Sequence, residues 1–200
     1  ISGDKLQFEK HHFLLLQNTL EGTSESLASR LKKLDFFEKT DFPLPPKLNA
    51  NLRSYQLEGY NWMHQLYENE FGGCLADDMG LGKSLQCITL LDFVRTTLPI
   101  IPNVEVPNLD LFSELSDSKV PLQSLIVCPT SLVYNWENEI QKFAPHFKVA
   151  LYLGKDRKQL QKTIQSQDIT ITSYSVLLRD FEWFNTLHFL YLIVDESQQI

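Results

Sequence analysis

Apolar and amphipathic stretches alternate along most of the chain. Short apolar runs that end in polar residues predict strands at 72–78, 124–128, 149–153, 168–173 and 189–196. Between them, apolar residues recur at helical spacing, which predicts helices at 53–70, 83–97, 131–143 and 155–165. The strands are apolar throughout rather than alternately polar. We therefore expect an α/β fold with a central, mostly parallel sheet covered by helices on both faces.

Two regions depart from this alternation. Leu27, Leu31 and Leu34 lie on one face of a helix, so residues 1–47 are expected to form a small helical appendage that ends in a proline-rich linker. The stretch at about 97–123 is rich in proline and acidic residues and predicts a surface insertion. The α/β lobe is expected to occupy residues 48–200.

The composition is that of a globular protein. Hydrophobic residues make up 43% and charged residues 22% of the chain. No apolar run is long enough for a transmembrane helix, so no membrane partner is expected. The chain shows no signal peptide and does not begin with Met, and we expect it to be a piece of a longer protein.

Charge and cysteine usage narrow the function classes. The net charge of −7 argues against a globally basic nucleic-acid-binding protein but allows a local basic strip. The helix predicted at 155–165 carries four basic residues, Lys155, Arg157, Lys158 and Lys162. A basic helix face of this kind is more commonly a solvated surface than a nucleic-acid-binding site. The three cysteines are expected to be free core thiols, and the five histidines lack the spacing of metal ligands.

The segment "DDMGLGKS" at 77–84 is close to a phosphate-binding loop. Its first position, which is glycine in the general pattern, is Asp77. The residues expected to approach phosphates most closely are Gly80 and Gly82, and Lys83 would reach the β- and γ-phosphates. The hydroxyl of Ser84 would bind Mg²⁺. The alternative is a chance glycine-rich turn with a surface lysine.

The segment "YLIVDESQ" supplies a second candidate group of residues. An apolar strand there ends in Asp195 and Glu196. The first carboxylate can hold Mg²⁺ and the second can polarise the attacking water. Acidic residues end many strands, so this signal gains weight only together with the loop upstream.

Five blocks occur in a fixed order: "LRSYQLEGYNWM", "LADDMGLGKSLQ", "LIVCPTSLVYNWENEI", "ITSYSVL" and "LIVDESQ". Together they resemble the first ATPase lobe of the Snf2 family of helicase-like DNA translocases, within helicase superfamily 2. The resemblance covers about residues 48–200 and implies a RecA-like lobe of an ATP-dependent translocase on double-stranded DNA. The family accepts a non-glycine residue where Asp77 stands.

The resemblance also implies roles for individual residues. Gln56, with Arg53 and Tyr55, matches the block that reads adenine. The phosphate loop would include Met79, Gly80, Leu81, Gly82, Lys83 and Ser84, with Mg²⁺ held by Ser84 and Asp195. Lys83 and Glu196 would be catalytic. The residues that would contact the DNA backbone are Pro129, Thr130, Ser131, Ser173 and Tyr174. Trp136 lies on the apolar stripe of its helix and is interpreted as a core residue.

Other features limit what the resemblance implies. The family's DExx box, which begins with the two acidic residues after the last strand, reads Asp195-Glu196-Ser197-Gln198 here. This form is closer to the box of bacterial members and lacks the histidine common in eukaryotic remodelers. The second RecA-like lobe, which carries the family's arginine fingers, is not in this sequence, so this chain alone is expected to be nearly inactive. The protein acted on is unknown, and the expected location is the bacterial cytoplasm and nucleoid, or the nucleus in a eukaryote.

Three other functions remain open. They are a different phosphate-loop enzyme such as a small-molecule kinase, a non-catalytic nucleotide-binding interaction module, and another superfamily 2 helicase that unwinds nucleic acid.

Overall fold

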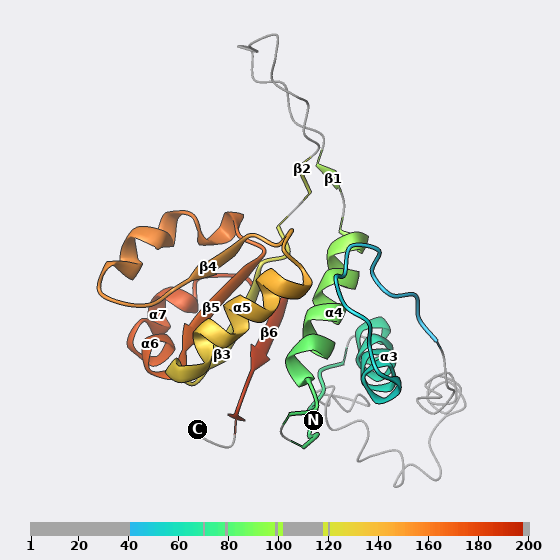
Figure 1. Cartoon of the computed structure of the whole chain (residues 1–200). Coiled ribbons are helices and arrows are strands. Elements are labelled where there is room, and N and C mark those ends of the chain that lie inside the picture. Colours follow the sequence, from blue (N-terminus) through green and yellow to red (C-terminus); the bar gives the residue numbers. More distant parts are fainter. Residues whose placement is uncertain are drawn as a thin grey trace, which may run out of the picture. The chain divides into compact units, whose positions relative to one another are not determined.

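The computed structural model describes residues 41–69, 71–78, 80–98, 100–101, 118–119 and 121–197 (Figure 1). The predicted appendage up to residue 40, Met79, most of the predicted insertion and residues 198–200 lie outside the described residues. Described residues 41–43 and 52–86 belong to one compact unit. Described residues 44–51 and those from 87 onward belong to a second unit.

The first unit is built on helix α3, Ser54–Glu68, which confirms the helix predicted at 53–70. Its buried apolar residues include Tyr60, Met63 and Leu66. The first residues of the proline-rich segment pack on this helix, and the Tyr60 hydroxyl donates a 2.9 Å hydrogen bond to the Pro43 carbonyl. The Phe42 ring stacks on His64 with 3.6 Å between centroids.

Helix α4, Lys83–Thr97, has the bounds that the sequence predicts. Its residues up to Gln86 belong to the first unit and those from Cys87 to the second. Ile88, Leu91 and Val94 are fully buried, as expected for a helix that is apolar on most sides.

The strand predicted at 72–78 is wrong, because these residues have no strand conformation in the structure. Only Cys74, Leu75 and Ala76 are apolar there, and the two aspartates that follow are of a type depleted in strands. The carbonyls of Asp77 and Asp78 accept hydrogen bonds from the Lys83 ammonium instead of from a neighbouring strand.

The second unit contains a four-stranded sheet in the order β4-β5-β3-β6. Its strands are β3 (Ser124–Cys128), β4 (Val149–Leu151), β5 (Ile169–Ser173) and β6 (Tyr191–Val194). All neighbouring pairs are parallel, with Ser124 opposite Ile169 on one side and Tyr191 on the other. Every residue of β3 and β5 is buried. The predicted parallel sheet is therefore confirmed, and its four strands overlap the four predicted from residue 124 onward.

A short antiparallel pair lies outside this sheet. It joins β1 (Ile100–Ile101) to β2 (Ser118–Lys119). Both strands fall within the region predicted as an insertion.

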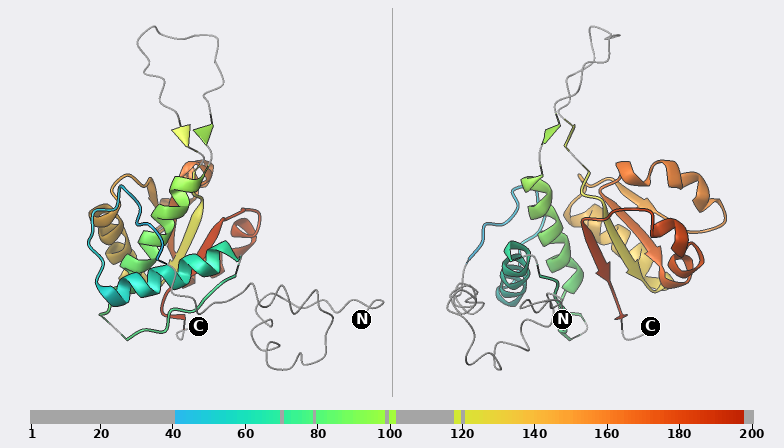
Figure 2. Two further views of the ribbon diagram at one scale, coloured as in Figure 1. Left: turned by 90° about the vertical axis from the view of Figure 1, so that its right-hand side faces the viewer. Right: turned by 180° about the vertical axis from the view of Figure 1, so that it is seen from behind.

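Helices cover both faces of the sheet (Figures 1 and 2). A short 3₁₀ turn, η2 (Thr130–Leu132), leads into α5 (Val133–Phe143) on one face. The other face carries α6 (Tyr174–Arg179) and α7 (Phe181–Phe184). On that face Leu125 and Val127 pack with Val176 and Phe184.

The helix predicted at 155–165 is helical in the structure, but it is divided into two 3₁₀ helices, η3 (Asp156–Lys162) and η4 (Ile164–Ser166). Arg157 points inward, where its guanidinium donates to the Asp180 carboxylate and to the Gly154 carbonyl. A 3₁₀ helix aligns positions three apart, which places Arg157 and Leu160 on the same inward side. The exposed basic face is therefore reduced to Lys155, Lys158 and Lys162.

Asp168 connects three segments at the amino end of the sheet. Its carboxylate accepts hydrogen bonds from the backbone N–H groups of Leu122 and Lys148. It also pairs with Arg95 of α4 at 3.0 Å. The Asp168 side chain is 2% exposed, so this buried carboxylate is paired and hydrogen-bonded, as burial requires.

Candidate functional site

The phosphate loop of the first unit depends on two glycines in a left-handed conformation. Gly80 has φ of 85° and Gly82 has φ of 73°. A β-carbon at Gly82 would also lie 2.5 Å from Nε2 of Gln56. Both the backbone conformation and the close approach of Gln56 therefore require glycine at position 82.

Asp77, unlike the two glycines, contributes to the loop through its backbone carbonyl. Among the described residues, positive φ at non-glycine positions occurs only at Gln123 and Glu196, so position 77 does not require glycine. The Lys83 ammonium donates hydrogen bonds of 2.8 Å to the Asp77 carbonyl and 3.0 Å to the Asp78 carbonyl. The start of the loop thus holds the lysine through its backbone. Ser84 follows in the first turn of α4 and is partly exposed.

Gln56 ties α3 to the phosphate loop. Its side chain is 7% exposed, and its Nε2 donates a 3.1 Å hydrogen bond to the Leu81 carbonyl. Its Oε1 accepts a 3.0 Å hydrogen bond from the Arg53 backbone N–H. One N–H group and one lone pair of the amide remain for a ligand.

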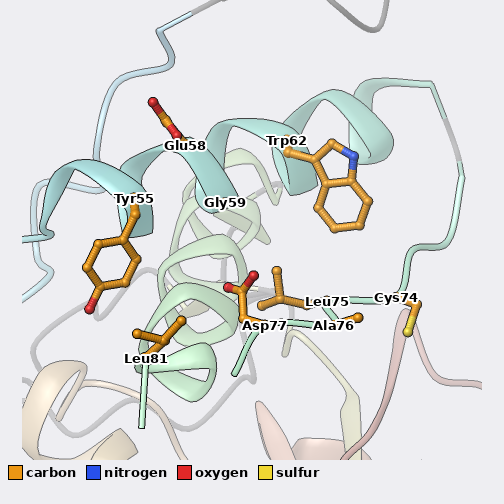
Figure 3. A pocket seen from close by; sticks show the side chains of 9 residues that line it. All are labelled: Tyr55, Glu58, Gly59, Trp62, Cys74, Leu75, Ala76, Asp77 and Leu81. Atoms are coloured by element: carbon orange, nitrogen blue, oxygen red, sulfur yellow. The ribbon is translucent and has the colours of Figure 1, made fainter. Parts of the chain in front are cut away.

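A pocket of about 470 Å³ lies beside the loop within the first unit (Figure 3). Its lining residues are Tyr55, Glu58, Gly59, Trp62, Cys74, Leu75, Ala76, Asp77 and Leu81. Figure 3 shows the Asp77 carboxylate pointing toward α3 from the opposite wall. The volume is in the range of small-molecule sites.

Sequence reasoning found Tyr55 but not the other residues that line this wall of α3. Tyr55, Gly59 and Trp62 follow helical spacing of four and three, and Glu58 is adjacent. They therefore share one face of the helix. This helical spacing from Tyr55 could have identified them from the sequence.

The second unit holds Asp195 by four hydrogen bonds. Its backbone N–H donates to the Val127 carbonyl at 2.8 Å. Carboxylate Oδ2 accepts from Trp136 Nε1 at 2.9 Å, and Oδ1 accepts from the Glu196 N–H at 3.0 Å. The Tyr174 hydroxyl donates to the Asp195 carbonyl at 2.5 Å. The carboxylate directly after β6 is therefore fixed in orientation.

Glu196 has φ of 53°, which is uncommon for a residue with a long side chain. Such conformations persist where the surrounding structure imposes them and are concentrated at functional sites. Here the hydrogen bond between its N–H and Asp195 Oδ1 fixes the turn.

The oxygen ligands available fit Mg²⁺. Mg²⁺ is usually held by one or two carboxylates, phosphate oxygens and water rather than by a cage of protein ligands. Each oxygen of the Asp195 carboxylate accepts one N–H, from Trp136 or from Glu196, and so retains a lone pair for a cation.

Two cysteine thiols near Asp195 have raised pKa values. Desolvation, with a smaller contribution from Asp195, raises the pKa of Cys87 and of Cys128 to about 12. Both therefore stay protonated near neutral pH and do not compete as thiolate ligands. All three cysteines are free, as predicted, but Cys74 is exposed rather than in the core.

The residues predicted to contact DNA differ in exposure. Thr130 and Ser131 are exposed in η2, and Pro129 before them is partly buried. Ser173 is 1% exposed, and its hydroxyl lies 3.2 Å from that of Ser175. The side chain of Ser173 therefore faces the protein, and Ser175 is the exposed hydroxyl of this block.

The family model for the SNF2-related domain matches residues 55–200. The chain belongs to the SNF2 family. Its RecA-like fold also agrees with the solved SWI2/SNF2 ATPase core of Sulfolobus solfataricus in complex with double-stranded DNA, at 35% identity and a TM-score of 0.64. That alignment covers 80% of this chain and 29% of the solved chain.

The curated relatives include bacterial and fungal proteins. A protein of Mycoplasma genitalium described as an uncharacterized ATP-dependent helicase is 39% identical over 75% of this chain and 13% of its own length. The helicase SWR1 of Debaryomyces hansenii is 37% identical over 80% of this chain and 9% of its own. The chain thus spans about a tenth of the length of these relatives. The range of organisms leaves the assignment to a bacterial type as a prediction.

None of the helices that the structure describes in this SNF2 lobe has both the length and the apolar character needed to cross a bilayer.

Proposed function

We propose that this chain is the first RecA-like lobe of a SNF2-type ATPase that uses ATP hydrolysis to move along double-stranded DNA. The observation that carries the proposal is the phosphate loop, in which left-handed Gly80 and Gly82 lead directly into α4 with Lys83 and Ser84 in its first turn. Backbone N–H groups at such a helix start favour phosphate. The family is one of ATP-dependent helicases and remodeling ATPases, which supports ATP as the nucleotide.

Four polar residues have proposed roles in ATP binding and hydrolysis. Lys83 binds the β- and γ-phosphates, and its position is set by the carbonyls of Asp77 and Asp78. Ser84 and Asp195 hold Mg²⁺, and Glu196 orients and polarises the attacking water. When bound, Mg²⁺ would neutralise charge on the phosphate oxygens. Lys83 and Glu196 are therefore the proposed catalytic residues.

The adenine base is proposed to bind near Gln56. Its free N–H and lone pair suit the N6/N7 edge of adenine, which presents one donor and one acceptor. Arg53 and Tyr55 flank it, and Tyr55 lines the pocket beside the loop. The backbone of the remaining loop residues, Met79 to Gly82, completes the proposed nucleotide contacts.

Double-stranded DNA is the proposed polymer partner. The solved SWI2/SNF2 core that resembles this chain is described as a complex with double-stranded DNA. Exposed Thr130 and Ser131 precede α5, and small hydroxyl side chains of this kind suit backbone phosphates. Pro129 and the Ser173–Tyr174 block are proposed to shape the same contact.

Further partners follow from the family. A second RecA-like lobe would complete the catalytic site with its arginine residues. The fungal relatives include the chromatin-remodeling ATPase INO80, so a nuclear location is proposed if the source is eukaryotic, and the nucleoid if it is bacterial.

The test is ATP hydrolysis by the full-length protein that contains this chain, measured with and without double-stranded DNA. We expect DNA to increase the rate, and Lys83→Ala to abolish hydrolysis in both conditions. Lys158→Ala, which removes an exposed lysine from η3, is the matched control. Hydrolysis that does not respond to DNA would contradict the proposal.

A further inference from the structure

Two side chains from separate segments of the second unit hold Asp195 in place. Trp136 comes from α5, and Tyr174 is the first residue of α6. In sequence they lie 59 and 21 positions from Asp195. The two bonds therefore connect three segments of the fold at one carboxylate residue.

Trp136 fixes the side chain of Asp195. Its indole is 4% exposed, and Nε1 donates the 2.9 Å hydrogen bond to Oδ2. An indole N–H can only donate, so Oδ2 is the acceptor and the bond defines which lone pairs of the carboxylate stay available. Val133 and Ile140 of the same helix are also buried, so Trp136 belongs to the buried face of α5.

Tyr174 fixes the backbone of the same residue. Its hydroxyl donates to the Asp195 carbonyl at 2.5 Å. The bond restrains the turn after β6, where Glu196 has its left-handed φ. Together, the two donors set both the position and the orientation of the carboxylate.

The same two segments carry the proposed DNA contacts. Exposed Thr130 and Ser131 lie in η2, which continues into α5. Exposed Ser175 is next to Tyr174 in α6. A DNA phosphate bound by the hydroxyls of Thr130 and Ser131, or by that of Ser175, would therefore contact a segment that also holds Asp195.

We propose that Trp136 and Tyr174 are positioning residues that couple DNA binding to metal binding at Asp195. The proposal rests on the proposed function, since it assumes that Asp195 holds Mg²⁺ and that η2 and α6 meet DNA. Coupling of this kind is reciprocal: DNA strengthens binding of the Mg²⁺–nucleotide by the same factor by which the Mg²⁺–nucleotide strengthens binding of DNA.

The experiment uses Trp136→Phe and Tyr174→Phe, which remove the donors and keep the rings. The matched controls are Trp183→Phe and Tyr152→Phe. Trp183 stacks on Tyr152 at 4.9 Å, and the Tyr152 hydroxyl bonds to Asp180 rather than to Asp195. All variants are made in the full-length protein, and thermal unfolding is measured for each.

The readout is the affinity for a fluorescent, non-hydrolysable ATP analogue, measured with Mg²⁺ and with EDTA, and with and without double-stranded DNA. In Trp136→Phe we expect the gain in affinity due to Mg²⁺ to fall about 10-fold or more, as for other groups that orient metal ligands. Affinity in EDTA should stay unchanged. DNA should increase the affinity of the unmodified protein for the Mg²⁺–nucleotide by some factor. In both Trp136→Phe and Tyr174→Phe this factor should fall toward 1, while the controls should retain it.

Equal behaviour of the two variants and their controls would overturn the proposal, whether all keep the coupling or all lose it. Failure of the proposed function is a different result. In that case the unmodified protein itself would show no effect of Mg²⁺ or DNA on nucleotide affinity.

Discussion

The ammonium group of Lys83 lies 2.8 Å from the backbone carbonyl of Asp77, at the opposite end of the same loop. The bond closes the loop on itself and uses only the backbone of Asp77. It accounts for an aspartate at a position where the general phosphate-loop pattern has glycine.

Lys83→Ala should weaken ATP binding. It removes a charge-assisted contact to phosphate that is worth about 1.5–3 kcal/mol, which corresponds to roughly 10- to 150-fold in affinity. Titration of the full-length protein with a fluorescent ATP analogue measures this directly. Lys158→Ala should bind ATP as the unmodified protein does, and an unchanged affinity in Lys83→Ala would exclude the phosphate role.

Gln56→Ala should reduce the preference for ATP over GTP more than it reduces phosphate affinity. The substitution removes the amide that we propose reads adenine, and it also breaks the 3.1 Å bond to the Leu81 carbonyl. Competition of ATP and GTP for the same fluorescent analogue gives the ratio of affinities. Because loss of the Leu81 bond alone could loosen the loop, a second variant is needed.

Gly82→Ala serves as that second variant. It strains the φ of 73° and places a β-carbon 2.5 Å from Gln56 Nε2, so it disturbs the loop while leaving the amide in the protein. We expect it to weaken ATP and GTP alike. Equal binding of ATP and GTP by the unmodified protein would rule out adenine recognition by Gln56.

The sequence predicts helix α4 and strand β3 at their observed bounds. In α4 the apolar residues recur at helical spacing and are buried, and β3 is a short apolar run that is buried throughout. The strand predicted at 72–78 is wrong, because the carbonyls of Asp77 and Asp78 bind the Lys83 ammonium and only three residues of the segment are apolar. The helix predicted at 155–165 is present as two 3₁₀ helices, and the long-range bond from Arg157 to Asp180 is not visible in local periodicity.

The candidate site was predictable only in part. The motif identifies Gly80, Gly82 and Lys83 because they are close in sequence and chemically distinctive. Trp136 was interpreted as a core residue, which its 4% exposure confirms, but its hydrogen bond to Asp195 joins residues far apart in sequence. Tyr174 was assigned to DNA, whereas its hydroxyl is bonded to the Asp195 carbonyl.

Arg157→Met should destabilise the second unit. The guanidinium makes two bonds to the Asp180 carboxylate, and both side chains are about one-tenth exposed, at 10% and 8%. Removal of one partner leaves a largely buried charge without its counterion. Chemical denaturation should show a lower midpoint for Arg157→Met and an unchanged midpoint for the exposed neighbour variant Lys158→Met.

The Arg157–Asp180 pair should also make the stability of the protein depend on pH. Hydrogen bonds from Arg157 lower the pKa of Asp180 below its ordinary value of 3.8. A lowered carboxyl pKa contributes stability that is complete above the ordinary value and is lost as the pH falls through the lowered one. The difference in stability between the unmodified protein and Asp180→Asn should therefore shrink below pH 3.8. A difference that stays constant down to the acid transition would show that the ionised pair contributes nothing.

The 200-residue chain alone should hydrolyse ATP barely or not at all. An arginine finger contributes about 10³–10⁵ in rate, and in this family it belongs to the second lobe. Steady-state release of phosphate by the purified chain, with and without double-stranded DNA, checks this. Turnover near 1 per second, which is an ordinary enzyme rate, would contradict it.

Movement along the duplex without strand separation is the central claim, and displacement of a triplex-forming strand measures it most directly. The full-length protein is incubated with ATP and a long duplex that carries a third strand, and a parallel reaction follows unwinding of the same duplex. We predict that the third strand is released while the duplex stays intact, and that Lys83→Ala releases nothing. Unwinding of the long duplex without release of the third strand would place the protein with conventional helicases and contradict the account.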